Sequence, residues 1–170
     1  MKYTVLKADI TRLSVDAIVN AANSRLAGGG GVDGAIHREA GPELSAACRA
    51  LIAKKGSLPP GEAVITPAFG IKTARFIIHT VGPIWGVNED PDGLLASCYR
   101  ASIAAAREKG ARTVAFPNIS TGVYGFPLER AAKIVHATLM AIPDLERDFD
   151  EIVFACFDEK NLALYRALFR

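Results

Sequence analysis

Short, wholly apolar segments recur along this chain between longer amphipathic ones, and this alternation strongly constrains the fold. The runs at residues 17–19 and 76–78 are typical of strands that are covered on both faces of a sheet. Between such runs, apolar residues recur at the three- and four-residue spacing of helices with one buried face. Strands that alternate with helices predict an α/β domain: a three-layer α/β/α sandwich around a mixed, mostly parallel sheet.

The pattern also predicts where the elements lie and how many domains they form. We expect strands at residues 3–6, 17–19, 62–67, 75–81, 113–116 and 152–156, and helices at 33–40, from 42 to about 55, at 91–109, and after 127 and 158. No linker, repeat or low-complexity segment interrupts them. At this length the simplest prediction is one domain that spans residues 1–170.

Charge and cysteine usage exclude several functional classes. The formal net charge is +2 without a basic cluster, so nothing indicates a nucleic-acid or membrane partner. No apolar stretch is long enough for export or for a membrane span. The three cysteines and three histidines do not cluster with metal-ligand spacing, so no metal is expected. We expect a cytoplasmic protein with buried, reduced thiols.

The stretch from residue 20 to residue 41 carries the strongest functional signal. It runs from a predicted strand through four consecutive glycines, Gly28 to Gly31, into a predicted helix that includes Asp33. Glycine allows backbone N–H groups to converge, and a helix start adds unpaired donors and partial positive charge. The order of strand, glycine loop and helix start therefore predicts an anion site, most often for phosphate. The alternative is a flexible surface loop.

Other polar or glycine-bearing stretches follow predicted strand ends, where open α/β sheets bind ligands. Residues 120–125 repeat the loop-then-helix pattern, and two phosphate-suited loops on neighbouring strands favour a diphosphate. Asp9 is suited to accept a hydrogen bond from an adenine amino group, and Phe157 offers a face for base stacking. The alternatives are a turn-capping role for Asp9 and a core position for Phe157.

Common phosphate and hydrolase motifs fit poorly. Gly29, Gly31 and Gly34 formally match the dinucleotide pattern, but their loop is too far from its strand and the later acidic residue is missing. No Gly-Lys-Ser/Thr follows the glycines, and no Gly-x-Ser-x-Gly elbow exists. A P-loop is excluded and a serine-hydrolase triad has little support.

Five segments together resemble a macrodomain of the MacroD-type branch: Ala8 to Thr11, Asn20 to Asn23, Gly28 to His37, Ile78 to Pro83 and Ser120 to Gly125. The resemblance covers nearly the whole chain and is most specific in the run Gly-Gly-Gly-Gly-Val-Asp-Gly-Ala-Ile-His. It implies binding of ADP-ribose. It also implies a hydrolase that deacetylates O-acetyl-ADP-ribose and removes mono-ADP-ribose from acidic side chains. The implied partners are ADP-ribose, its esters and ADP-ribosylated proteins.

The resemblance also implies a role for each matching residue. Asp9 and the backbone of Ile10 would bind the adenine amino group, and Phe157 would lie against the adenine ring. Asn23 and Asp33 would face the distal ribose, and Tyr124 would close over it; these three are the predicted catalytic residues. The diphosphate and the ribose would be wrapped by Gly31, Val32, Ser120, Thr121, Gly122, Val123, Tyr124 and Phe126.

The expected chemistry is attack of water on an ester, with Asp33 positioning the water or a ribose hydroxyl. A carboxylate at a helix start should have a lowered pKa, so we expect Asp33 mainly to orient, with ligand phosphate sharing the proton transfer. Alternatively, Asp33 only caps its helix. We interpret His79 as structural and assign His37 a packing or surface role.

No cofactor is required for such a reaction. Two other functions use the same pocket: a reader module that binds ADP-ribose without turnover, and a phosphatase acting on ADP-ribose 1″-phosphate. The sequence does not distinguish the physiological substrate, the oligomeric state or a regulatory partner.

Overall fold

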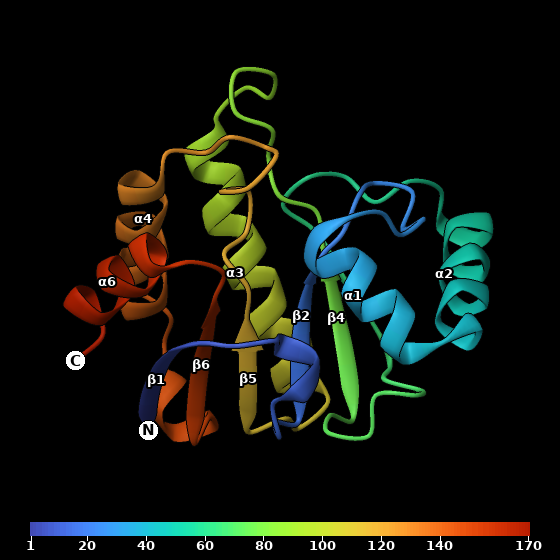
Figure 1. Cartoon of the computed structure of the whole chain (residues 1–170), viewed down its shortest axis with the longest axis horizontal. Helices are drawn as coiled ribbons and strands as arrows, with labels where there is room; N and C mark the ends of the chain where they lie inside the picture. The colour runs from blue at the N-terminus through green and yellow to red at the C-terminus, as the bar shows by residue number, and fades with distance from the viewer.

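The computed structural model describes all of residues 1–170 and shows one six-stranded sheet between two layers of helices (Figure 1). The strands are β1 (Lys2–Lys7), β2 (Ala17–Ala21), β3 (Ala63–Pro67), β4 (Phe76–Thr80), β5 (Thr113–Phe116) and β6 (Glu151–Cys156). The helices are η1 (Ile10–Arg12), α1 (Gly31–Ala40), α2 (Pro42–Lys55), α3 (Pro91–Glu108), α4 (Leu128–Met140), α5 (Leu145–Asp148) and α6 (Glu159–Leu168). The predicted three-layer α/β/α sandwich is confirmed.

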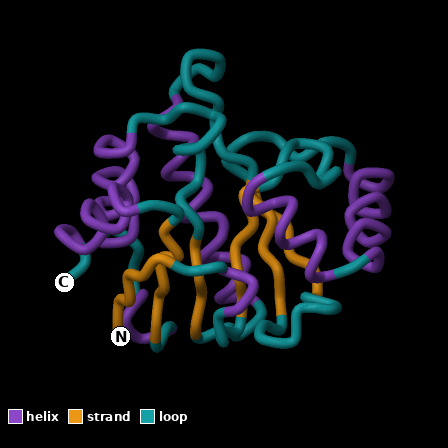
Figure 2. The backbone as a smooth tube through the Cα atoms, in the orientation of Figure 1, coloured by secondary structure: helices purple, strands orange, loops and turns teal.

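The strand order is β1-β6-β5-β2-β4-β3, and only β3 runs antiparallel to its neighbour. The five parallel strands consequently end at the same edge of the sheet, which we call the carboxyl edge. The loops that leave this edge gather at the top of the molecule in Figure 2. Parallel pairing thus brings together loops that are far apart in the sequence.

Two apolar cores lie on opposite faces of the sheet. Alternate residues of β2 divide between them: Val19 packs in the core under α3, α4 and α6, whereas Ile18 packs in the core under α1 and α2. Neighbouring positions of β4, Ile78 and Ile77, divide in the same way. Burial on both faces explains why these strands are apolar throughout.

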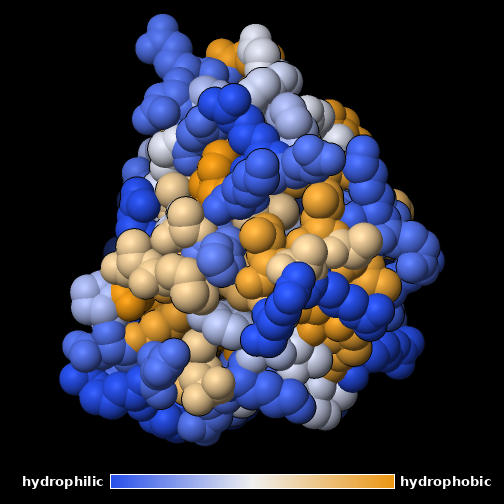
Figure 3. Space-filling view, turned by 90° about the vertical axis from the view of Figure 1, so that its left-hand side faces the viewer, coloured by the Kyte–Doolittle hydropathy of each residue, from blue (hydrophilic) through white to orange (hydrophobic).

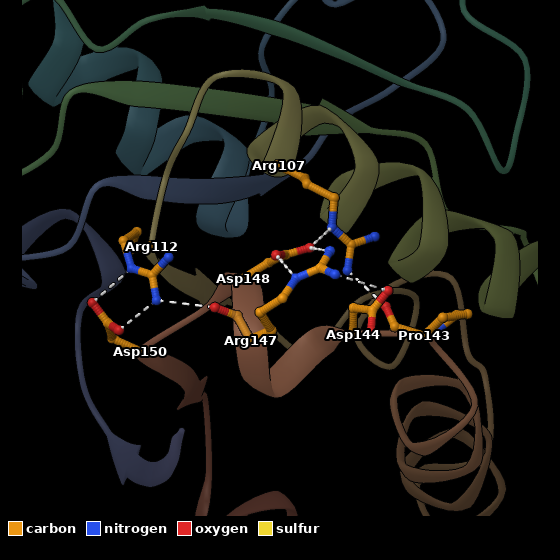
Figure 4. A network of polar contacts seen from close by, with 7 residues as sticks. All are labelled: Arg107, Arg112, Pro143, Asp144, Arg147, Asp148 and Asp150. Carbon is orange, nitrogen blue, oxygen red and sulfur yellow. Dashed lines mark hydrogen bonds and ion pairs between the residues drawn. The ribbon is translucent and has the colours of Figure 1, made fainter.

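A cluster of ion pairs lies where β5 and β6 begin, at the edge of the sheet opposite the carboxyl edge; Figure 4 shows these pairs from close by. Arg107 Nε lies 2.7 Å from the Asp148 carboxylate, and Arg112 Nη2 donates to Asp150 Oδ1 at 2.8 Å. These pairs tie the segment around α5 to the end of α3 and the start of β5.

The side of the molecule formed by β1, α4 and α6 shows apolar patches among hydrophilic side chains (Figure 3). No helix has the length and apolar character needed to span a bilayer.

Candidate functional site at the carboxyl edge

The glycine loop connects β2 to α1 and is held in shape by Asn23. The Asn23 side chain donates from Nδ2 to the Gly28 carbonyl oxygen (2.8 Å) and accepts at Oδ1 from the backbone N–H groups of Arg25 and Ala27. One N–H of the amide is left over, because a carboxamide nitrogen carries two hydrogens. The predicted ligand residue therefore also organises the turn that leads into the glycines.

Close backbone approach explains why small residues are needed where the loop meets α1. Gly28 and Gly31 have φ of +79° and +58°, in the left-handed region that glycine tolerates. A Cβ added to Gly34 would collide with the carbonyl oxygen of Gly29. The loop lies directly on the first turn of α1.

Asp33 lies in that first turn and is buried, with 6% of the residue exposed. Its Oδ1 accepts a hydrogen bond from Asn20 Nδ2 at 2.9 Å, and an added Cβ on Gly29 would lie 3.7 Å from its Oδ2. Burial raises the pKa of Asp33, against the opposing effects of the Asn20 hydrogen bond and the His37 ring. The expectation of a lowered pKa was wrong, because removal from water raises the pKa by more than the Asn20 hydrogen bond and the His37 ring lower it.

The capping interpretation of Asp33 is also wrong. The N-cap of α1 is Gly30, and no side-chain hydrogen bond caps this helix. The carboxylate instead faces Asn20 on β2 and His37 one turn further along α1.

Residues that the sequence did not assign to the site surround this carboxylate. His37 Nε2 lies 3.5 Å from Asp33 Oδ1, and its ring packs beneath Gly28. The packing or surface role predicted for His37 is thus accompanied by a contact with Asp33. From α2, Cys48 lies nearby; burial and the Asp33 charge raise its pKa to about 11, so it stays a thiol. The four-residue spacing of Asp33 and His37 was the signal available in the sequence.

The second loop, between β5 and α4, reaches toward the end of β4. Ser120 is buried at a φ of +67°, and its carbonyl oxygen accepts from the backbone N–H of Phe126 at 2.9 Å. The Tyr124 carbonyl oxygen accepts from the Trp85 backbone N–H at 2.9 Å, and the Trp85 and Phe126 rings lie 4.9 Å apart between centroids. Thr121 Oγ1 donates to the Asn118 carbonyl oxygen, and Gly122 and Val123 are exposed at the loop tip.

Asp9 and Phe157 lie at the far end of the carboxyl edge, after β1 and β6. Asp9 Oδ1 accepts from both the backbone N–H and the hydroxyl of Thr11, which lowers its pKa and caps η1. The turn-capping alternative therefore holds, and its hydrogen bonds all fall on one of the two carboxylate oxygens. Phe157 is 83% exposed, so the core interpretation of this ring was wrong. Ile10, by contrast, is buried.

The strand order places these groups in a row. Asp9 and Phe157 follow adjacent strands β1 and β6, the Ser120 loop follows β5, and the glycine loop with Asp33 follows β2. Adjacent strands are about 4.8 Å apart, so β6 and β2 are separated by roughly 10 Å. The row suits an elongated ligand with an aromatic group at one end, anionic groups in the middle and a reactive group beside Asp33. No group of three or more His, Cys, Asp or Glu side chains is placed to hold a metal ion.

The fold and this row define a class: an α/β/α domain that offers a glycine-rich, anion-suited edge outside the strand ends. Residues 19–135 match the model of the Macro domain family, and the chain belongs to that family.

Known relatives and solved structures agree with this assignment. A macro domain-containing protein of Ralstonia nicotianae is 58% identical over 94% of this chain and 90% of its own length. A Klebsiella pneumoniae protein named O-acetyl-ADP-ribose deacetylase is 50% identical over 96% of this chain and 94% of its own. The Oceanobacillus iheyensis macrodomain solved with ADP has a TM-score of 0.90 at 43% identity, covering 96% of this chain and 87% of that one. A variant of that macrodomain was solved with ADPR and has a TM-score of 0.89 at 42% identity, covering 96% of this chain and 89% of that one.

Proposed function

We propose that this macrodomain binds ADP-ribose along the carboxyl edge and hydrolyses esters on its distal ribose. The substrates are O-acetyl-ADP-ribose and mono-ADP-ribose attached to acidic side chains of proteins. The buried Asp33 carboxylate beneath the glycine loop carries this proposal, because a reader of ADP-ribose has no need of a desolvated carboxylate at that position. The deacetylase name of a 50% identical relative agrees with it.

Following the row of groups, we assign one part of the ligand to each loop. The adenine ring stacks on exposed Phe157. The free carboxylate oxygen of Asp9 accepts a hydrogen bond from the adenine amino group, beside the backbone of Ile10. The diphosphate lies between the two loops, against backbone N–H groups from Gly31–Val32 and residues 120–126. The distal ribose then reaches Asn23 and Asp33, with Tyr124 covering it.

Asp33 has the properties of a general base in this arrangement. A raised pKa makes the carboxylate a stronger proton acceptor than an exposed aspartate. Water attacks the ester carbonyl carbon and gives one proton to Asp33. When the tetrahedral intermediate collapses, the bond to the ribose oxygen breaks and that oxygen takes the proton back. The products are the free carboxylic acid and ADP-ribose, and Asp33 is unchanged.

Calorimetry with ADP-ribose and release assays with O-acetyl-ADP-ribose and ADP-ribosylated protein test this proposal. We expect wild-type protein to bind and to turn over both esters, and Asp33→Ala and Asp33→Asn to lower kcat by about 10²- to 10⁴-fold with binding retained. Near-normal turnover by Asp33→Asn would rule out a base and leave an orienting role. The matched control is Glu39→Gln, which removes an exposed carboxylate from the same helix.

Two other outcomes would identify the alternative functions. Binding of ADP-ribose without turnover of any ester would make the domain a reader. Release of phosphate from ADP-ribose 1″-phosphate, with the esters left intact, would make it a phosphatase. Absence of heat on titration with ADP-ribose would overturn the proposed function altogether.

A further inference from the structure

Three buried polar side chains form a hydrogen-bonded chain beneath α1, and this chain ends at Asp33. Thr66 on β3, His79 on β4 and Asn20 on β2 are each at most 4% exposed. Asn20 and His79 are register partners in the parallel pair β2–β4, and His79 pairs with Val64, two residues before Thr66. Alternate residues of a strand share a face, so all three lie on the face that α1 covers. Polar groups that are buried among apolar side chains require hydrogen-bond partners, and here they partner one another.

The donor and acceptor of each hydrogen bond can be assigned in turn, starting at the Asp33 carboxylate. Asn20 Nδ2 lies 2.9 Å from Asp33 Oδ1, which as a carboxylate oxygen only accepts. The same nitrogen lies 3.1 Å from His79 Nδ1, so its second hydrogen points at that ring nitrogen. Nδ1 must then be the unprotonated nitrogen, and the ring proton belongs to Nε2. Thr66 Oγ1 lies 3.0 Å from Nε2 and accepts that proton's hydrogen bond.

Each member therefore constrains the next. Asn20 Oδ1 is buried without a partner, so its amide orientation is decided by Nδ2 alone. If the His79 proton moved to Nδ1, it would face the Asn20 nitrogen, and the amide would turn over to accept it. The amide oxygen would then face the Asp33 carboxylate, and two acceptors would meet in a site removed from water.

We infer that Thr66 and His79 are positioning residues for Asp33: the Thr66 hydroxyl accepts the hydrogen bond of His79 Nε2–H and so stabilises that tautomer, whose unprotonated Nδ1 holds Asn20 with its N–H toward the carboxylate. This inference rests on the proposed function only for its kinetic consequence, because the tautomer exists without substrate. Neither residue lies among those that would contact the ligand.

The kinetic consequence concerns the ionisation of Asp33. The other titratable groups that face it are His37 from α1 and Cys48 from α2. Loss of the Asn20 donor removes an interaction that lowers the pKa of Asp33, so that pKa rises further. As the pH is lowered, Asp33 then becomes protonated at a higher pH than in the wild type. The acidic limb of the kcat–pH profile therefore moves to higher pH.

The test is Thr66→Val, which keeps the shape and removes the hydroxyl, compared with Thr66→Ser, which restores it. Long-range ¹H–¹⁵N spectra of the three histidines report the His79 tautomer in the absence of any ligand. We expect Nε2–H in the wild type and Thr66→Ser, and a large Nδ1–H population in Thr66→Val. With O-acetyl-ADP-ribose, we expect Thr66→Val to lower kcat by about tenfold and to move its acidic limb up by about one pH unit. KM should change less than about twofold, since the ligand contacts remain.

The control is Thr138→Val, which removes a buried hydroxyl from α4, far from the hydrogen-bonded chain of Thr66, His79 and Asn20. It should leave the tautomer and the kinetics unchanged. A wild-type His79 that carries its proton on Nδ1, or on both nitrogens, overturns the inference even if Thr66→Val fails to fold. An unchanged tautomer and pH profile in folded Thr66→Val also overturns it. If the wild type turns over no ester, the proposed function fails while the tautomer measurement still decides this inference.

Discussion

The backbone N–H of Phe157 donates to Asn118 Oδ1 at 3.0 Å and joins the end of β6 to the loop after β5. This bond fixes the backbone that carries the Phe157 ring, while the ring itself is exposed to solvent. Because the backbone is already fixed, only the rotation of the Phe157 side chain has to be restricted when a flat ligand stacks on its ring. The proposed adenine and diphosphate subsites are therefore joined by one side chain.

Phe157→Ala should weaken ADP-ribose binding without affecting stability. Stacking of a base on an aromatic side chain is worth about 1–3 kcal/mol, so we expect calorimetry to show a loss of affinity of about 5- to 150-fold. The unfolding free energy should stay within about 0.5 kcal/mol, because the ring has few contacts to lose. Ribose 5-phosphate, which lacks the base, serves as the control ligand. An equal loss of affinity for both ligands would contradict stacking.

Asp33→Asn should change how stability depends on pH. A carboxyl whose pKa is raised on folding binds more protons in the folded state, so the wild type loses stability as the pH rises from the unfolded pKa of 3.8 through the folded pKa. The amide variant lacks this loss. Urea titrations between pH 3 and 7 should show its advantage over the wild type growing with pH, by at most about 1.4 kcal/mol per unit. A constant difference, or one of opposite sign, would show that burial does not control this carboxyl.

His79 should give a pH dependence of opposite sign. Burial lowers the pKa of His79 from 6.5 to about 3, so the unfolded chain binds the proton first. The wild type therefore loses stability as the pH falls from about 6.5 toward 3, by at most about 1.4 kcal/mol per unit from this residue. His79→Asn keeps an acceptor near the Nδ1 position and removes the titration. Its loss of stability relative to the wild type should therefore shrink as the pH falls; parallel curves for the two proteins would contradict a buried neutral ring.

Gly34→Ala should destabilise the protein although alanine is the better helix former. The added methyl group meets the Gly29 carbonyl oxygen, a backbone atom that cannot move without distorting the loop. We expect a loss of about 1–3 kcal/mol in chemical unfolding, and weaker ADP-ribose binding because the loop shifts. Gly30→Ala is the matched control, since nothing lies within 4 Å of its added Cβ and its φ is −94°. Equal effects of the two changes would mean that close approach is not the reason for Gly34.

Most elements of the fold were predictable because they depend on local patterns. Burial on both faces makes a strand apolar throughout, and Pro91 and Asp158 mark the helix starts that the structure confirms. The short helix α5 was not predicted, since four residues are too few to show a period. The gathering of loops at one edge was also predictable, because parallel strands end on the same side.

The sequence by itself determined the elements, the glycine loop and the residue types at the strand ends. The tertiary structure decided their neighbours: the strand order sets Phe157 beside the loop after β5, and the antiparallel β3 brings Thr66 to His79. It also decided the sign of the Asp33 pKa shift, because exclusion of water depends on the packing of β2, α1 and α2 together. Local patterns act over a few residues, whereas burial and hydrogen-bond partners are set by chain segments that are far apart in sequence.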